Sequence, residues 1–141
     1  MTSDLRADCS RCVGLCCVAP AFTASADFAL TKPAGTPCPN LQADFSCGIH
    51  TQLRLMGFPG CTGYDCFGAG QRVTASFSGQ DWLTPSVAGP MLATFEVVRA
   101  LHELLWYLNR SPGSWNTPAH LSSARPAKLR NAWRGVPTAW M

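Results

Sequence analysis

The stretch Cys9-Ser-Arg-Cys12-Val-Gly-Leu-Cys16-Cys17 decides the fold of the N-terminal half of this 141-residue chain. Two thiolates separated by two residues can bind one metal, because the turn between them brings both sulfurs to the same side and supplies N–H donors. Adjacent side chains generally diverge, so Cys16 and Cys17 should not both serve one mononuclear site. We expect one of this pair to bind a different metal atom or to remain a reactive thiol.

Four further cysteines follow before residue 67, and they must return in space if they are to complete a site with the first four. The candidate ligands of a metal or cofactor are Cys9, Cys12, Cys16, Cys17, Cys38, Cys47, Cys61 and Cys66. The segment around them is rich in Gly, Pro, Ser, Thr and Asp, so burial of apolar side chains alone would not offset the entropy of ordering it. We therefore predict an irregular region that a metal cross-links, with metal binding coupled to folding.

The N-terminal sequence and the lack of long apolar stretches predict a cytoplasmic protein. No apolar signal-peptide segment precedes Cys9, and no stretch reaches the roughly 18 consecutive apolar residues of a membrane span. In a reducing compartment, eight cysteines are more often metal ligands or catalytic thiols than a disulfide framework, although a disulfide could coexist with a metal site.

Zinc and iron–sulfur chemistry use these cysteines differently. Two structural zinc sites with four ligands each would account for all eight, whereas one [4Fe–4S] cluster needs four, or three if one iron is open. The tight C-x2-C-x3-C-C spacing packs the sulfurs more closely than the separated pairs of a zinc ribbon. We therefore predict a [4Fe–4S] cluster, with zinc as the alternative.

The cysteine motif, followed by Cys38-Pro-Asn-Leu41 and Cys47-Gly-Ile-His50, resembles the YkgJ-type cysteine-cluster family, which is described as zinc- or iron-chelating. The stretch from Ala7 through Gln71, with the later Leu101-His-Glu-Leu-Leu-Trp-Tyr-Leu108, is also similar to the cysteine-rich region of actinobacterial pentapeptide-repeat proteins. The resemblance implies a metal and no particular reaction. No pentapeptide repeats follow in this sequence, and His50 stands where the cysteine-cluster pattern commonly has tyrosine.

Four other side chains are candidates for work beside a cofactor. His50 has a ligand-like C-x2-H spacing after Cys47, but it is more often an ordinary loop histidine in such a position. Asp65 is expected to cap a local turn, although it and Tyr64 lie between two cysteines and could handle protons. His102 belongs to an incomplete H-E-x-x-H motif, so we expect a core histidine rather than a ligand.

We predict a mainly α fold with a large irregular, metal-stapled loop region, in one small cysteine-rich domain spanning residues 1–141. Residues 1–70 form the metal-binding region, and residues 85–134 form a helical region that packs against it. The main helix runs from about Met91 to Asn109 and begins near Thr84-Pro85 or Gly89-Pro90. Two apolar stripes supply its core face: Val97, Leu101, Leu104 and Leu108, and beside them Met91, Phe95, Val98 and Leu105.

Smaller elements are also predicted. Residues 68–90 form a turn-rich connector with one extended piece at residues 73–77. Leu41 to His50 form a hairpin-like turn, and Thr51 to Met56 form one or two helical turns that Gly57 ends. A weaker helix is expected from Pro118 to Trp133, and we expect Trp115, Trp133 and Trp140 to fold back on the main helix. The sequence Gly68-Ala-Gly70 is interpreted as a turn.

Charge is unevenly distributed along the chain. Residues 1–66 carry four basic and five acidic side chains, whereas residues 67–141 carry seven basic and three acidic ones. The basic C-terminal half is either a solvated tail or the binding surface for a protein partner or an anionic small molecule, with nucleic acid disfavoured. Two functions stay open: a cluster-binding protein for electron transfer or an accessory role, and a small metalloenzyme with an open iron site. A structural zinc-binding interaction module is a third.

Overall fold

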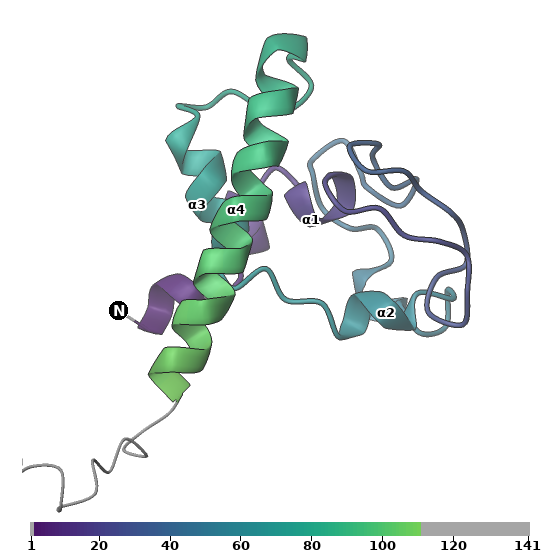
Figure 1. The fold of residues 1–141 in the computed structure, drawn as a ribbon. Helices are drawn as coiled ribbons and strands as arrows, with labels where there is room; N and C mark the ends of the chain where they lie inside the picture. Colours follow the sequence, from purple (N-terminus) through teal and green to yellow (C-terminus); the bar gives the residue numbers. More distant parts are fainter. Residues whose placement is uncertain (1, 111–141) are drawn as a thin grey trace, which may run out of the picture. The chain divides into compact units, whose positions relative to one another are not determined.

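One long helix organises the part of the chain that the structure describes. The computed structural model describes residues 2–110, in which α4 spans Pro85–Arg110 (Figure 1). The helix begins at the proline of the Thr84-Pro85 pair, where the missing N–H is not needed, and it continues through Pro90. The prediction of a main helix that starts at one of the two proline pairs is therefore confirmed.

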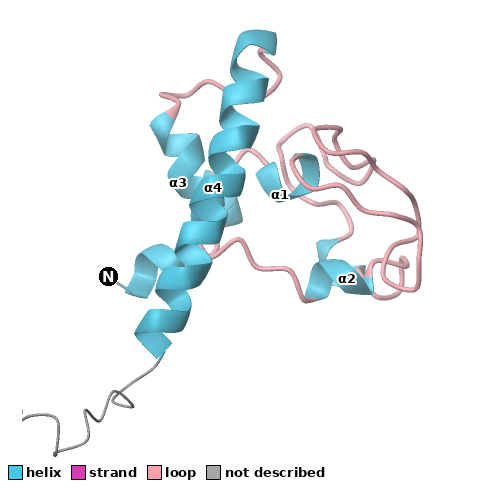
Figure 2. Ribbon diagram, viewed as in Figure 1, coloured by secondary structure: helices cyan, strands magenta, loops and turns pink. Residues whose placement is uncertain are grey.

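The remaining elements are short and helical. Within residues 2–110 the structure contains no strand, only the isolated antiparallel bridges Phe22↔Lys32 and Leu41↔Cys47 (Figure 2). The other helices are α1 (Leu15–Val18), α2 (Pro59–Thr62) and α3 (Ala69–Ser76), with 3₁₀ turns at Thr2–Leu5, Cys9–Arg11 and His50–Gln52. The mainly α prediction is confirmed, whereas the cross-linking metal stays a prediction. None of these helices is long and apolar enough to cross a membrane.

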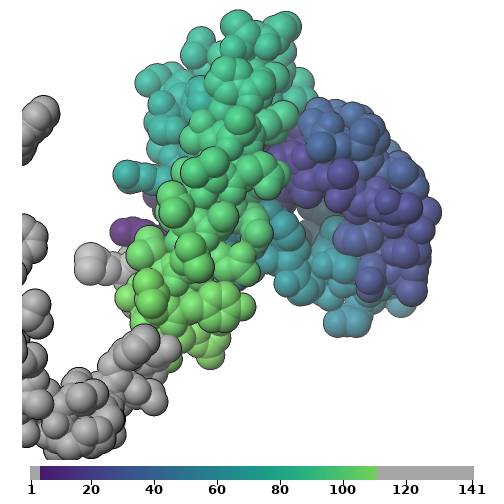
Figure 3. Space-filling model, in the orientation of Figure 1, coloured from purple at the N-terminus to yellow at the C-terminus, as the bar shows by residue number. Residues whose placement is uncertain are grey.

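The core lies where α1, α3 and α4 meet. Met91 and Phe95 of α4 are fully buried and pack with Leu15 of α1 and Val73 of α3. These large side chains account for much of the apolar burial in the described residues, so the N-terminal half of α4 is held far more firmly than its C-terminal half. The cysteine-rich loops gather on one side of the long helix, as the purple-to-blue atoms show in Figure 3.

One of the two predicted core stripes is wrong for this part of the chain. Val97, Leu101, Leu104 and Leu108 are between 54% and 66% exposed. Met91 and Phe95, from the adjoining stripe, are buried, and Val98 packs against them, whereas Leu105 of that stripe is 47% exposed. The helical spacing correctly indicated apolar faces, but spacing alone does not tell which face a neighbouring element covers.

The predicted extended connector at residues 73–77 is also wrong, because most of it belongs to α3. Val73 is buried in the core, and the helix starts at Gly68, whose φ of 77° is a left-handed conformation that glycine adopts readily. Packing against α4 outweighs the preference of β-branched side chains for strands. Gly68-Ala-Gly70, interpreted as a turn, is the beginning of this helix.

The two loop predictions are confirmed. The Leu41↔Cys47 bridge closes a hairpin-like turn in which the Gln42 N–H donates to the Ser46 carbonyl at 2.8 Å. One 3₁₀ turn follows at His50–Gln52, and the turns after it end at Gly57 with a positive φ of 82°. The predicted helix from Pro118, the three C-terminal tryptophans and the helical region beyond residue 110 lie outside the described residues.

Candidate metal centre

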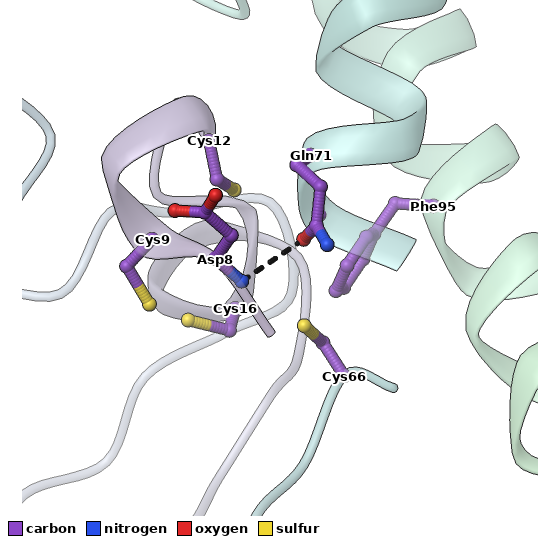
Figure 4. Close-up of a pocket in the computed structure, with 8 residues that line it drawn as sticks. Asp8, Cys9, Cys12, Cys16, Cys66, Gln71 and Phe95 are labelled. Atoms are coloured by element: carbon purple, nitrogen blue, oxygen red, sulfur yellow. Dashed lines mark hydrogen bonds between the residues drawn. The ribbon is translucent and has the colours of Figure 1, made fainter. Parts of the chain in front are cut away.

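Four thiols face one small recess between the N-terminal segment and α3. The recess has a volume of about 20 Å³, and Phe95 of α4 closes part of its wall (Figure 4). Its cysteines are Cys9, Cys12, Cys16 and Cys66, which we call the first thiol group. Three members come from the opening motif, whereas Cys66 comes from the residues just before α3. The sequence had placed Cys66 with the later cysteines instead.

A glycine of α3 lets two of these sulfurs approach the helix closely. A Cβ atom added at Gly70 would lie 2.7 Å from the Cys12 Sγ and 3.8 Å from the Cys66 Sγ. The first distance is shorter than any normal van der Waals contact, so even alanine would displace the Cys12 side chain. Gly70 is therefore part of the site, although the sequence pattern suggested only a turn.

A buried glutamine holds the segment that leads into Cys9. The Gln71 Oε1 accepts a hydrogen bond from the Asp8 N–H at 3.2 Å, and its Nε2 donates to the Arg6 carbonyl at 2.7 Å (Figure 4). Gln71 is buried, so these two bonds also satisfy its own polar atoms. The side chain fixes the backbone before the first ligand candidate against α3.

The loop between Cys12 and Cys16 is fixed in a similar way at Val13. The Val13 N–H donates to the Thr74 hydroxyl at 3.2 Å, and the Trp82 indole N–H donates to the Val13 carbonyl at 2.7 Å. Both backbone groups of this residue are therefore satisfied by side chains from the α3 region. The opening motif is thus held by α3 and by the loop that follows it.

The other four cysteines, Cys17, Cys38, Cys47 and Cys61, form what we call the second thiol group. The Cys38 N–H donates to the Cys17 carbonyl at 2.9 Å. The Leu41 N–H donates to the Cys38 carbonyl at 3.0 Å, and Leu41 pairs with Cys47 in an antiparallel bridge. Cys61 in α2 lines the same larger cavity as Cys17 and Cys47. These contacts join three loops around the second group.

A buried lysine lies beside the second thiol group. Lys32 is only 3% exposed, and its Nζ donates to the carbonyls of Thr36, Val18 and Pro33 at 2.7, 3.0 and 3.2 Å. Burial lowers the pKa of Lys32, and the nearby thiols of Cys38 and Cys17 act in the opposite direction. One ammonium group therefore donates to three carbonyls and lies close to two thiols.

Burial makes several of the thiols weaker acids. It raises the pKa of Cys9, Cys12 and Cys61, and neighbouring thiols add to the effect at Cys9 and Cys61. At Cys12, hydrogen bonds from the backbone of Leu15 and Gly14 partly oppose this rise. A hydrogen bond with the Cys17 side chain, followed by burial, raises the pKa of Cys16. The N–H donors at Cys12 are already placed to stabilise a thiolate.

A larger cavity of about 560 Å³ adjoins the recess. Seven of the eight cysteines line it, all except Cys38, together with the aromatic rings of Phe22, Phe28 and Phe45. His50 and Tyr64, two sequence candidates, also line it. Burial raises the pKa of the Tyr64 hydroxyl, so it stays protonated at neutral pH.

The other two candidates have structural roles. Asp65 lines the cavity, but its Oδ1 accepts a hydrogen bond from the Phe67 N–H at 2.7 Å, which is the local turn contact that we expected. A ring nitrogen of His102, Nδ1, lies 2.7 Å from the Phe67 carbonyl oxygen. His102 thus ties α4 to the segment before α3, in agreement with a packed histidine rather than a ligand.

The thiols are close to one another without forming a finished metal site. All eight cysteines are free thiols. Between residues 2 and 110, no group of three or more Cys, His, Asp or Glu side chains is arranged so that it could hold a metal ion. Binding would therefore have to draw the sulfurs together. The ligand assignment stays a prediction, and the sequence missed the contributions of Gly70, Gln71 and Lys32, for which it offered only local signals.

Comparison with known proteins gives one informative relative. No family model matches the chain, and no solved structure matches it. The "Uncharacterized protein YybG" of Bacillus subtilis (strain 168) is 51% identical over 110 residues, which cover 77% of this chain and 39% of that protein. The chain thus spans about two-fifths of the length of the curated relative it matches, and the resemblance to the cysteine-cluster family stays a prediction.

Proposed function

We propose that this chain is a cysteine-ligated iron–sulfur protein with an electron-transfer or accessory role. The observation that carries the proposal is the first thiol group: four thiols from two distant segments face one recess, and a glycine replaces the side chain that would block them. Thiolate-only ligand sets are typical of [4Fe–4S] clusters and of structural zinc.

The size of the surrounding cavity favours the cluster over zinc. In a [4Fe–4S] cluster each thiolate binds a different iron, so the ligands surround a polyatomic group rather than one ion. Seven thiols lining about 560 Å³ suit such an arrangement better than the closed shell of a single zinc ion. A bound cluster would supply one-electron redox chemistry, and the N–H groups near Cys12 would donate to its thiolate.

The test is anaerobic reconstitution of the full chain with iron and sulfide. We expect a brown protein with a broad visible absorption band and near-stoichiometric iron and sulfide. The Cys12→Ala variant should lose much of this absorption, whereas Ser86→Ala, an exposed substitution in α4, should keep it. A colourless protein that binds two zinc ions per chain would instead support the zinc interaction module.

A small metalloenzyme with an open iron is the second candidate, because the cavity volume lies in the range of small-molecule sites. His50 and Tyr64 line that cavity and would handle protons. Cyanide added to the reduced, loaded protein probes an open iron directly. A changed electron paramagnetic resonance spectrum supports the enzyme, and an unchanged spectrum supports complete ligation by cysteine.

A further inference from the structure

We propose that the chain holds two separate four-thiolate metal centres, which divide between the neighbouring residues Cys16 and Cys17. This inference rests on the proposed function and specifies the ligands and number of the centres. The first centre uses the first thiol group, Cys9, Cys12, Cys16 and Cys66, and the second uses the second thiol group, Cys17, Cys38, Cys47 and Cys61.

The first centre is defined by its recess. Cys66 lines it together with Cys9, Cys12 and Cys16, although it lies 50 positions after Cys16 in the sequence. The start of α3 brings it there, because the Ala69 N–H donates to the Cys66 carbonyl at 2.9 Å and Gly70 lies between Cys12 and Cys66. Cys17 does not line this recess.

The second centre is defined by backbone contacts among the loops that carry its cysteines. The Cys17 carbonyl accepts a hydrogen bond from the Cys38 N–H. The Cys38 carbonyl in turn accepts one from Leu41, which pairs with Cys47 in an antiparallel bridge. Cys17, Cys47 and Cys61 also line one cavity, so these contacts assign the remaining four cysteines to a second centre.

Complete ligation follows from a division into two sets of four. Four thiolates fill the coordination of one zinc ion, or provide one ligand for each iron of a [4Fe–4S] cluster. No cysteine is then left over, and no iron lacks a protein ligand. The division thus favours an electron-transfer or accessory role over an enzyme with an open iron. Loading requires that the hydrogen bond between the Cys16 and Cys17 side chains be broken.

The two centres differ in their electrostatic surroundings. The buried ammonium of Lys32 lies near Cys17 and Cys38, whereas the first recess is lined by Asp8, whose carboxylate pairs with Arg11 at 2.7 Å. A positive charge stabilises an anionic thiolate centre, whereas a carboxylate destabilises it. Two loaded clusters should therefore give two distinguishable signals.

Pairs of alanine substitutions test the division, because each pair removes two thiols but from different centres. The full-length variants are C16A/C66A, C17A/C61A and C16A/C17A, reconstituted anaerobically with iron and sulfide. We expect the first two to keep about half of the wild-type iron and sulfide per chain and to lose different spectral components. C16A/C17A should keep almost none, since it damages both centres.

The grouping by sequence predicts the reverse, because there Cys16 and Cys17 share one centre and Cys66 belongs to the other. Half-loading of C16A/C17A together with loss of all iron from C16A/C66A would overturn the inference. A wild-type chain that loads only one centre would also overturn it while leaving the proposed function intact. A chain that takes up neither iron nor zinc defeats the proposed function itself.

Two further measurements keep the test decisive. Far-ultraviolet circular dichroism of the variants reports whether α4 is retained, so a loss of iron is separated from a loss of fold. Native mass spectrometry after zinc addition counts the metal ions bound by each variant, so it tests the same division of the cysteines without the need to assemble a cluster. One zinc ion in C16A/C66A and in C17A/C61A, with none in C16A/C17A, supports two centres, and any other pattern contradicts them.

Discussion

At the scale of single residues, the site depends both on a glycine that leaves room for the thiols and on a side chain that holds the backbone. Gly70 occupies a helix that would otherwise place a side chain between two thiols. Gln71, beside it, turns its amide to the backbone before Cys9. These two neighbours show that α3 acts as the support of the first thiol group, with one residue making room and the next holding the ligand segment.

Gly70→Ala should damage the site despite the better helix propensity of alanine. The gain in propensity is about 0.5–1 kcal/mol, whereas forcing a methyl group against the Cys12 sulfur costs about 1–3 kcal/mol. We expect a net fall of roughly 1–2 kcal/mol in the free energy of unfolding, measured by urea denaturation, and weaker metal uptake. Gly63→Ala is the matched control, because the nearest atom to an added Cβ there lies at 3.9 Å. Equal behaviour of the two variants would show that Gly70 is not constrained by the thiols.

Lys32→Met should destabilise the loops around the second thiol group. The substitution keeps much of the side-chain volume but removes the donor to three carbonyls, and unsatisfied buried acceptors cost about 1–3 kcal/mol. Thermal unfolding of the full chain measures the loss. The exposed cation Arg54, changed to Met, should shift stability by less than about 0.5 kcal/mol. A Lys32 variant as stable as the Arg54 variant would mean that the three bonds contribute nothing net.

At the scale of elements, α4 has two halves with different environments. Its N-terminal half buries Met91 and Phe95 against α1 and α3, whereas its C-terminal half exposes Leu101 and its apolar neighbours. His102 and Trp106 still link that half to Phe67, through a contact to the Phe67 carbonyl and a pair of rings 5.4 Å apart. The helix therefore contacts α1 and α3 through its N-terminal half and the segment before α3 through its C-terminal half.

The sequence predicted these elements to different degrees, and the reason is physical. Proline pairs and apolar spacing are local signals, so the start of α4 and its helical nature could be predicted. The helix at residues 69–76 could not, because Val73 and Thr74 favour a strand until Val73 is buried against α4. The regrouping of Cys66 likewise depends on contacts between distant segments, which spacing does not encode.

Phe95→Ala should test how far the core supports the thiols. Phe95 is fully buried and also lines the recess of the first thiol group. Truncation of such a ring costs about 3–5 kcal/mol, so we expect a large fall in the urea midpoint and lower metal occupancy of the first centre. Leu101→Ala, on the exposed stripe of the same helix, should change stability by less than about 0.5 kcal/mol. A large loss from Leu101→Ala would reveal that another surface covers this stripe.

At the scale of the whole molecule, the proposed function makes folding, thiol ionisation and metal binding one linked equilibrium. The described residues bury few large apolar side chains outside the contact of α1, α3 and α4, while most of the cysteines lie in loops. Such loops have little burial of their own to hold them together, so ligand bonds would contribute directly to the free energy of folding. The protonation of the thiols then sets the pH range over which metal can stabilise the chain.

Alkaline pH should destabilise the chain when metal has been removed with a chelator. Burial raises the pKa of Cys9, Cys12 and Cys61 above their ordinary value of 9.0, so between that value and the folded-state pKa the folded chain binds more protons than the unfolded chain. The contribution of these thiols to the free energy of unfolding is therefore fully present below about pH 9, and it is lost as the pH rises further. Urea denaturation at several pH values, with reductant present, measures this decline.

The loaded protein should respond to pH in the opposite direction. Because thiols must lose their protons to bind metal, loading releases about one proton for each thiol that becomes a ligand, and acid weakens the complex. Two complete centres predict roughly twice the proton release of C16A/C66A, which can be followed by calorimetry in buffers of different ionisation enthalpy. Equal proton release by the two proteins would mean that Cys16 and Cys66 take no part in metal binding. If the stability of the loaded chain were independent of pH, the thiols would not be the ligands of the metal.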